Sequence, residues 1–230
     1  HGLGPLDPDL CRELAIAAAA SPHSLLCLTI TDPDGIAIGH GCARAPRRTT
    51  PQAPASGSAA LPARVNLTIG SDRLTELART PAPPGKRPWT LTRDNGPGPP
   101  GGYGTWTLIL PGGRSLMMEL QPVPTFECDH RYESHAYQPN DTLRHLVQLR
   151  DGTCTFPPCN RHARESDFEH ARPYDKGGRT CACNAGARSR ACHRIKQSPG
   201  WNVTQPRPGW HQWTTPSGRT YVQGPKRYPA

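Results

Sequence analysis

The sequence predicts a mixed α+β protein, and three patterns support that class. Short apolar runs separated by turn residues fill the first half of the chain, which is typical of strands in hairpins. Leu143, Leu146 and Val147 recur at helical spacing, and residues 167–196 follow the order strand, turn, strand, helix. A chain of 230 residues corresponds to one or two domains at roughly 100–200 residues each, so it can bury a core.

The N-terminal segment is expected to begin with a helix over residues 7–20, with Asp7 as its cap. Strands at residues 25–31 and 36–38 then flank a turn that contains Pro and Gly. Residues 43–60 are rich in Pro, Ala and Ser, which is the composition of a linker.

The middle of the chain is expected to be rich in strands and to contain a long Pro/Gly-rich loop. The expected elements are a strand at 65–69, a helix at 74–79 capped by Ser71 or Asp72, a loop at 80–104, and a hairpin of strands 105–110 and 115–120.

The C-terminal third has a tighter pattern of helix, strand and turn signals. The expected elements are a helix from 139 to 151, a knuckle-like turn at Cys154–Cys159, strands at 167–170 and 180–183, a helix at 185–196 carrying Arg188, Arg190, Arg194 and Lys196, and small strands at 201–205 and 210–222 that cover this helix.

Basic residues are concentrated in the same third. The chain has 27 Lys and Arg against 18 Asp and Glu, which gives a net charge of +9. Between Arg144 and Lys196 there are eleven basic and five acidic residues, so a surplus of six lies within 53 residues. Such a concentration favours a polyanionic partner, and DNA is the partner that we expect.

The nine cysteines fall into two sets. Cys11, Cys27, Cys42 and Cys128 are scattered, and the odd total argues against a disulfide framework. The other five lie between Cys154 and Cys192 among histidines, which favours metal chemistry in a reducing cell. We therefore expect a cytoplasmic protein. No apolar run approaches the ~20 residues of a membrane span, and no signal peptide is predicted, although a chain that starts at His1 is expected to be a fragment or processed.

Hydrolysis of a phosphodiester requires a base to deprotonate water and a cation to neutralise charge on phosphorus and on the leaving oxygen. Glu169 and His170 are adjacent on an expected strand, so their side chains should point to opposite faces of it. His193 follows on the expected helix, and Asn184 lies at the start of that helix. These residue types therefore supply a candidate base and candidate metal ligands.

These residues resemble the motif of the HNH endonucleases. The resemblance consists of Glu169-His170, Pro173, Gly177-Gly178, Asn184 and Cys192-His193-x-x-Lys196, and Cys154-Thr-Phe-Pro-Pro-Cys159 looks like the segment that precedes the motif. Flanking stretches at 129–151 and 201–221 resemble one bacterial group in which a domain of unknown function precedes the nuclease. The resemblance is good over residues 129–222, partial over 1–42 and poor over 43–128.

The resemblance implies a ββα-metal fold, in which two strands and a helix surround one divalent cation such as Mg²⁺, Mn²⁺, Ni²⁺ or Zn²⁺. It implies that His170 is the general base and that Glu169 and His193 are metal ligands. Asn184 would hold the loop between the strands through backbone hydrogen bonds. Arg190, Arg194 and Lys196 are candidates for contact with DNA phosphates.

Many relatives of this kind add a structural Zn²⁺ held by two cysteine pairs. Cys154 and Cys159 form one pair here, and Cys192 is a candidate for the second. Ser189 occupies a position at which the family usually has a cysteine, so Cys181 or Cys183 is a candidate substitute. Packed free thiols are the alternative.

The resemblance also implies three regions. Residues 1–60 would be the C-terminal remnant of a domain of unknown function with its linker, 61–136 a strand-rich middle, and 137–230 the HNH nuclease domain. Two other functions stay open. The first is a non-catalytic, zinc-stabilised DNA-binding module, and the second is a secreted protein held by disulfides, against which the odd cysteine count weighs.

Overall fold

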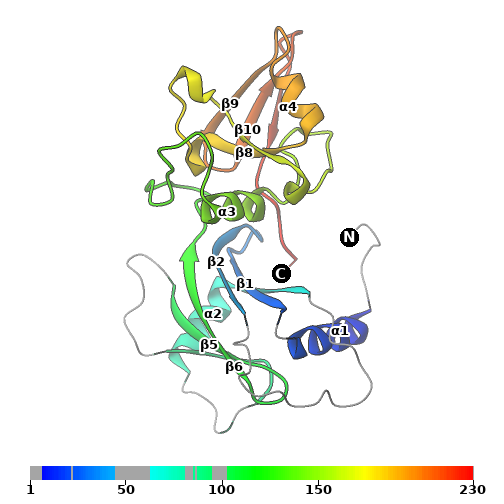
Figure 1. Ribbon diagram of the computed structural model, residues 1–230, viewed down its shortest axis with the longest axis vertical. Coiled ribbons are helices and arrows are strands. Elements are labelled where there is room, and N and C mark those ends of the chain that lie inside the picture. Colours follow the sequence, from blue (N-terminus) through cyan, green and yellow to red (C-terminus); the bar gives the residue numbers. More distant parts are fainter. Residues whose placement is uncertain are drawn as a thin grey trace. The chain divides into compact units, whose positions relative to one another are not determined.

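The computed structural model describes residues 7–21, 23–44, 63–80, 85, 87–94 and 103–229 (Figure 1). The fold is mixed α+β, as predicted, with four α-helices among the described residues. The chain forms two compact units, one of His1–Ile30 with Gly39–Pro122 and the other of Thr31–Ile38 with Val123–Ala230. The three-region division expected from sequence stays a prediction. Among the described helices, none combines the length and apolar character needed to span a bilayer.

Helix α1 (Pro8–Ala20) begins as the sequence predicts. The Asp7 carboxylate accepts hydrogen bonds from the backbone N–H groups of Asp9 and Leu10, at 2.9 and 3.2 Å. These bonds satisfy two of the N–H groups that a helix start leaves without partners.

A six-stranded sheet forms the centre of the first unit, with the order β3-β1-β2-β6-β5-β4. Its strands are β1 (Leu25–Thr31), β2 (Ala37–Arg44), β3 (Arg64–Gly70), β4 (Thr90–Arg93), β5 (Gly104–Ile109) and β6 (Ser115–Pro122). Helix α2 (Ser71–Arg79) contacts both β3 and β4, which are the two edge strands, so the sheet is curled. Buried residues alternate with half-buried ones in β5 and with exposed ones over most of β6, because one face of the sheet forms the core.

Several expected boundaries in this unit are wrong. Helix α2 starts at Ser71 directly after β3, with Gly70 as its cap and no capping side chain, so neither Ser71 nor Asp72 is the cap. The expected loop 80–104 contains β4, which pairs with β5 from Thr90↔Ile109 onward. Strand β2 extends to Arg44, and the remainder of the expected linker, 45–60, lies outside the described residues.

Helix α3 (Asp141–Asp151) confirms the predicted amphipathic helix. The Asn140 side chain accepts a hydrogen bond from the Leu143 N–H at 2.8 Å and caps it. Leu143 and Val147 pack against Ala182 and Ala185, which join the helix to the residues around the candidate site. Gly152 ends the helix with φ 67°, a value that favours glycine.

Strands β7 (Asp167–His170) and β8 (Ala185–Arg188) pair antiparallel, with Glu169 opposite Gly186, and α4 (Arg190–Lys196) follows. The strand predicted at 180–183 is wrong, because this stretch leads into a short 3₁₀ helix, η3 (Ala182–Asn184). The helix predicted from Ala185 begins at Arg190 instead, where the Ser189 hydroxyl accepts a hydrogen bond from the Cys192 N–H at 3.3 Å. Residues 185–188 are fully buried and form the second strand.

The C-terminal strands β9 (Asn202–Arg207), β10 (Trp210–Thr214) and β11 (Thr220–Gln223) form a small antiparallel sheet. Trp213 is fully buried and donates a hydrogen bond to the Thr155 carbonyl at 2.8 Å, so it packs in the core of this sheet. His211 approaches Gly186 so closely that a Cβ there would lie 2.5 Å from the ring. The sheet thus packs on β8, whereas the sequence suggested that it covers the helix.

Candidate active site and metal centres

Strand β7 and helix α4 bring Glu169 and His193 together. The Glu169 Oε2 lies 3.1 Å from the His193 Nε2. The other oxygen, Oε1, accepts a hydrogen bond from the Lys196 ammonium at 2.5 Å and lies 3.8 Å from the Arg188 guanidinium. The carboxylate is buried, and three cationic or imidazole groups surround it.

The imidazole of His193 is fixed from its other side by Asp167. Its Nδ1 lies 3.1 Å from the Asp167 Oδ2, and a carboxylate there accepts the Nδ1 proton. The Gln197 side-chain amide lies 3.1 Å from Nε2 and can donate to it. With the proton on Nδ1, Nε2 carries the lone pair, and both the Glu169 Oε2 and the Gln197 amide lie 3.1 Å from it. An imidazole held by a carboxylate at one nitrogen, with the other nitrogen as the ligand atom, is the arrangement of a metal-binding histidine.

His170 is buried at the end of β7, and its hydrogen bonds fix its tautomer. The Thr180 hydroxyl donates to the Tyr137 carbonyl at 3.3 Å, so its oxygen accepts from the His170 Nε2–H at 2.9 Å. Nδ1 of His170 is then the unprotonated nitrogen. The Tyr137 ring stacks on the imidazole, with 5.4 Å between ring centroids and 27° between planes.

Burial lowers the pKa of His170 below its usual 6.5. Glu169 raises the pKa again, and the charges of Lys196 and Arg188 lower it further, so the net shift is downward. The imidazole is therefore predominantly neutral near pH 7 and can accept a proton at Nδ1.

A pocket of about 670 Å³ lies at the end of β7. Glu169 and His170 both line it, together with His193 and Lys196, although adjacent strand residues were expected to point apart. Both reach the pocket because it extends around the strand end to residues 173–176 of the following loop. A candidate base and two candidate ligands thus share one cavity.

Asn184 makes the backbone hydrogen bonds expected of it. Its side chain accepts from the Arg172 N–H at 2.8 Å and donates to the carbonyls of Arg172 and Arg179 at 3.0 and 2.9 Å. Gly178 leaves room for this loop, since a Cβ there would lie 2.0 Å from the Arg172 oxygen. The hydrogen bonds of Asn184 are those predicted. Its position is not, because Asn184 lies between the two strands and not at the start of the helix.

The basic residues differ in position from the expectation. Arg190 and Arg194 are exposed on α4, and Arg190 forms an ion pair with Asp167 at 3.1 Å. Lys196 points inward to Glu169. Arg188 was expected on the helix but is fully buried on β8. Lys176, which the sequence analysis did not single out, lines the pocket.

The three cysteines proposed as zinc ligands lie together. The sulfur atoms of Cys154, Cys159 and Cys192 are all within 4.8 Å of one another, and the group could hold a metal ion. The Ser189 hydroxyl lies 3.7 Å from the Cys159 sulfur. Burial raises the pKa of Cys192 to about 12. The pKa of Cys159 is lowered overall. Burial raises it, but hydrogen bonds with the Arg161 backbone and the Ser189 side chain outweigh the effect of burial.

Cys181 and Cys183 do not join this group, so their suggested role as substitutes is wrong. Both lie with Cys128 and His130. The sequence analysis did not connect Cys128 and His130 with this segment, because more than 50 residues separate them from Cys181 in the chain. The only sequence signal was the shared spacing, Cys-x-His in one segment and Cys-x-Cys in the other.

Cys27 and Cys42 form a disulfide, although their scattered spacing led us to expect no disulfide framework. They lie 15 residues apart in the sequence, but on the paired strands β1 and β2. The hairpin therefore brings together two residues that appear unrelated along the chain.

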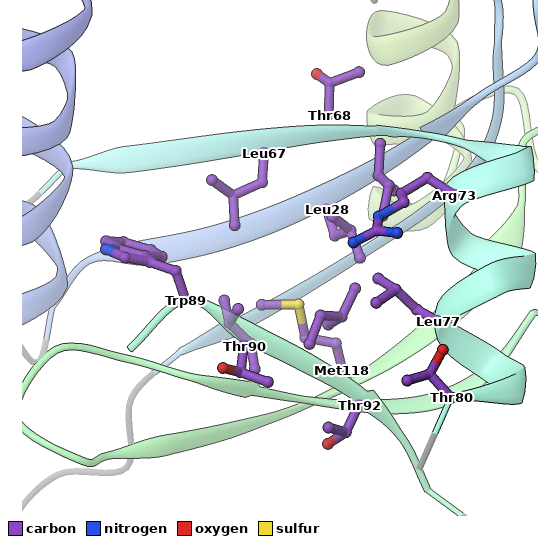
Figure 2. Close-up of a pocket in the computed structure, with 13 residues that line it drawn as sticks. Leu28, Leu67, Thr68, Arg73, Leu77, Thr80, Trp89, Thr90, Thr92 and Met118 are labelled. Atoms are coloured by element: carbon purple, nitrogen blue, oxygen red, sulfur yellow. The ribbon is translucent and has the colours of Figure 1, made fainter. Parts of the chain in front are cut away.

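A second pocket, of about 500 Å³, lies in the first unit between α2, β3 and the face of the curled sheet. Figure 2 shows Leu28, Leu67, Leu77 and Met118 directed into it, and Arg73 is the one charged side chain among its described lining residues. The lining is mostly apolar and offers no acid–base pair, so the chemistry of the described residues is concentrated in the second unit.

No family model matches the chain, and no solved structure matches it. The chain is similar to the uncharacterized protein Rv3776 of Mycobacterium tuberculosis, with 31% identity over 118 residues, which is 51% of this chain and 21% of the relative. It is also 32% identical over 146 residues to the uncharacterized protein Rv2100 of the same species, covering 59% of this chain and 26% of the relative. The chain therefore spans about a quarter of the length of the curated relatives it matches.

Proposed function

We propose that the second unit is a metal-dependent DNA endonuclease of the HNH type, in which β7, β8 and α4 form the ββα-metal core. The observation that carries the proposal is the approach of the Glu169 Oε2 to the His193 Nε2, at 3.1 Å, in the pocket that also contains the neutral His170. A binding surface for DNA alone has no need of a buried carboxylate beside a histidine at this position.

The donor set fits a divalent cation. One carboxylate oxygen and one imidazole nitrogen face the same point, and the Asp167 carboxylate holds the imidazole in the orientation of a ligand. Mg²⁺, Mn²⁺, Ni²⁺ and Zn²⁺ are all candidates for such a mixed set. When bound, the cation would supply positive charge to the phosphate and to the leaving oxygen.

His170 supplies the base. Its unprotonated Nδ1 takes a proton from a water molecule in the pocket, while Nε2 keeps its proton on the Thr180 hydroxyl. Asn184 holds the loop that carries Thr180, so the imidazole stays in place as it gains charge. A positioned base of this kind contributes about 10²–10⁴-fold to the rate.

Basic side chains favour DNA as the substrate. Lys176 lines the pocket, and the exposed Arg190 and Arg194 lie on α4 next to it. The Arg guanidinium matches phosphate geometry, and the charge surplus of residues 144–196 attracts a polyanion. We also propose a cytoplasmic location, because seven of the nine cysteines are free thiols.

Plasmid cleavage tests this function. The full chain, His170→Ala and the distant surface control His23→Ala would each be incubated with supercoiled DNA and EDTA, Mg²⁺, Mn²⁺, Ni²⁺ or Zn²⁺. We expect metal-dependent nicking by the parent and by the His23 variant, and loss of at least 10²-fold in the His170 variant. Absence of cleavage with every metal, in protein that still binds DNA, would rule out the enzyme.

A non-catalytic, zinc-stabilised DNA-binding module is the second candidate. Two observations favour it. The Lys196 ammonium already pairs with Glu169, and three cysteines of which two are buried lie close together. It predicts DNA binding that persists in His170→Ala and does not require added metal, measured by fluorescence anisotropy. The nuclease predicts in addition a cleavage rate that depends on added metal.

A further inference from the structure

A second cysteine–histidine group lies in the same unit, apart from the residues assigned above. It consists of Cys128, His130, Cys181 and Cys183, whose ligand atoms all lie within 4.8 Å of one another. Cys181 is buried, and Cys128 and Cys183 are half-buried. We propose that this group binds a structural Zn²⁺ through three thiolates and the Nδ1 of His130.

The distances match a tetrahedral site. With Zn–S bonds of about 2.3 Å and Zn–N bonds of about 2.0 Å, neighbouring ligand atoms are roughly 3.5–3.8 Å apart. The Cys128 and Cys181 sulfurs are 3.4 Å apart, and the His130 Nδ1 lies 3.3, 3.9 and 4.0 Å from the sulfurs of Cys181, Cys183 and Cys128. Three thiolates and one imidazole at these separations form the closed ligand set of a structural zinc.

The backbone at His130 supports a ligand role. Its φ of 61° is in the left-handed region, which a non-glycine residue seldom occupies. With the backbone in this conformation, Nδ1 lies 3.3–4.0 Å from the three sulfurs. Glu133 also lies 3.4 Å from Nδ1, but its carboxylate has a second partner in Arg179 at 3.1 Å and can stay with it when Nδ1 binds metal.

The ion would join two segments that surround His170. One segment begins at Cys128 and reaches Tyr137, whose ring stacks on the imidazole. The other contains Thr180, which bonds the imidazole directly and is followed by Cys181. A backbone hydrogen bond from the Ser134 N–H to the Thr180 carbonyl, at 2.9 Å, already connects the segments. Zinc would add a metal crosslink beside the hydrogen bonds and the Arg179–Glu133 ion pair that already join the segments, with release of the thiol protons.

This site shares no residue with the group of Cys154, Cys159 and Cys192, so the zinc bound at each site can be measured separately. Zinc content per chain would be measured by mass spectrometry for the parent, for Cys128→Ser with Cys183→Ser, and for Cys11→Ser. Cys11 is exposed and outside both groups, so it is the matched control. We expect the double variant to lose one zinc per chain and the control to lose none. A folded double variant with the zinc content of the parent would overturn the proposal.

A second measurement covers the case in which the double variant does not fold. In the Cys154→Ser, Cys159→Ser background, one equivalent of Co²⁺ should produce tetrahedral d–d bands and a thiolate charge-transfer band. Absence of both bands, or a Cys128–Cys181 disulfide found by peptide mass spectrometry of the purified chain, would refute the site. Neither measurement involves DNA cleavage, so the result is independent of the nuclease proposal.

Discussion

The Thr180 hydroxyl bonds the His170 imidazole and so fixes which of its two nitrogens carries the proton. It accepts from Nε2 in a buried bond and donates to the Tyr137 carbonyl in a partly buried one. A hydroxyl can do both at once, whereas a methyl group can do neither. The reactivity of the candidate base thus rests on a residue ten positions away in the sequence.

Replacing Thr180 tests this dependence. Thr180→Val keeps the shape of the side chain but removes the acceptor for Nε2–H, so both tautomers become accessible. We expect metal-dependent cleavage to fall roughly 10- to 100-fold, in the range of other supporting hydrogen bonds. Thr180→Ser should restore most of the rate. Equal losses in both variants, or unchanged rates in both, would show that the hydroxyl does not position the base.

His211 gives the second unit a dependence on pH. It is fully buried, and desolvation together with Arg188 and Arg150 lowers its pKa well below 6.5. The unfolded chain therefore binds a proton below pH 6.5 that the folded chain does not, and stability falls as the pH falls. The slope for one group is at most about 1.4 kcal/mol per pH unit.

Urea unfolding between pH 7.5 and 5 would measure this effect. His211→Gln has no proton to gain, so its free energy of unfolding should fall less steeply below pH 6.5 than that of the parent. His23→Gln, at an exposed position, serves as the control and should follow the parent. Parallel profiles for the parent and the His211 variant would contradict the prediction.

At the scale of elements, the sequence predicted α3 well and misplaced the strand and helix that follow η3. The spacing of Leu143, Leu146 and Val147 specifies a helix by itself. Residues 185–188 have no such signal, since three of them are Ala or Gly and show no apolar periodicity. Their small size lets this stretch pack closely against α3 and His211. Their strand conformation comes from pairing with β7, which is a tertiary contact that local sequence does not encode.

The same reasoning applies to the candidate site. Glu169, His170, Asn184 and His193 were found because they lie within 25 residues and resemble a known pattern. Thr180 and His130 were missed because their roles depend on contacts with distant residues, Tyr137 in one case and the 181–183 segment in the other. Residue type and spacing therefore revealed the reacting groups and not the groups that support them.

Ser189 combines two roles at the junction of β8 and α4. It caps the helix and lies beside the three sulfurs of Cys154, Cys159 and Cys192. Ser189→Cys would supply a fourth thiolate, so we expect zinc affinity at this group to rise at least 10-fold in a chelator competition. Without metal the variant should be less stable by about 0.5–2 kcal/mol through loss of the cap. Unchanged affinity would mean that the position does not face the ion.

At the scale of the whole molecule, the β1–β2 hairpin belongs to both units. Its tip, Thr31–Ile38, is grouped with residues 123–230, and Ala37 there packs with Val123 and Leu146. The Thr125 hydroxyl donates to the Ala37 carbonyl at 2.7 Å, and Ile36 pairs with Arg227. The second unit is therefore completed by residues that precede it in the sequence by almost 90 positions.

Ala37→Asp tests this arrangement. Ala37 is 1% exposed, so the new carboxylate would be buried without a partner, at a cost of several kcal/mol. We expect faster amide hydrogen exchange in α3, which packs against this position through Leu146. Asp34→Ala, at the exposed turn of the same hairpin, should leave exchange unchanged. Protection of α3 equal to that of the parent would show that the tip contributes little to the second unit.

The Arg150 guanidinium has a consequence for the order of folding. It donates to the carbonyls of Ala182 and Ala185, at 2.8 and 2.7 Å, on either side of Asn184. Strands β7 and β8 have four residues each, and an isolated two-stranded pair of that length is marginal in water. We therefore predict that the pair forms on a preformed α3 surface, and that the loop of about 35 residues between Arg150 and Ala185 is already closed in the transition state. Substitutions at Arg150 should slow refolding, whereas those in β11 should mainly speed unfolding.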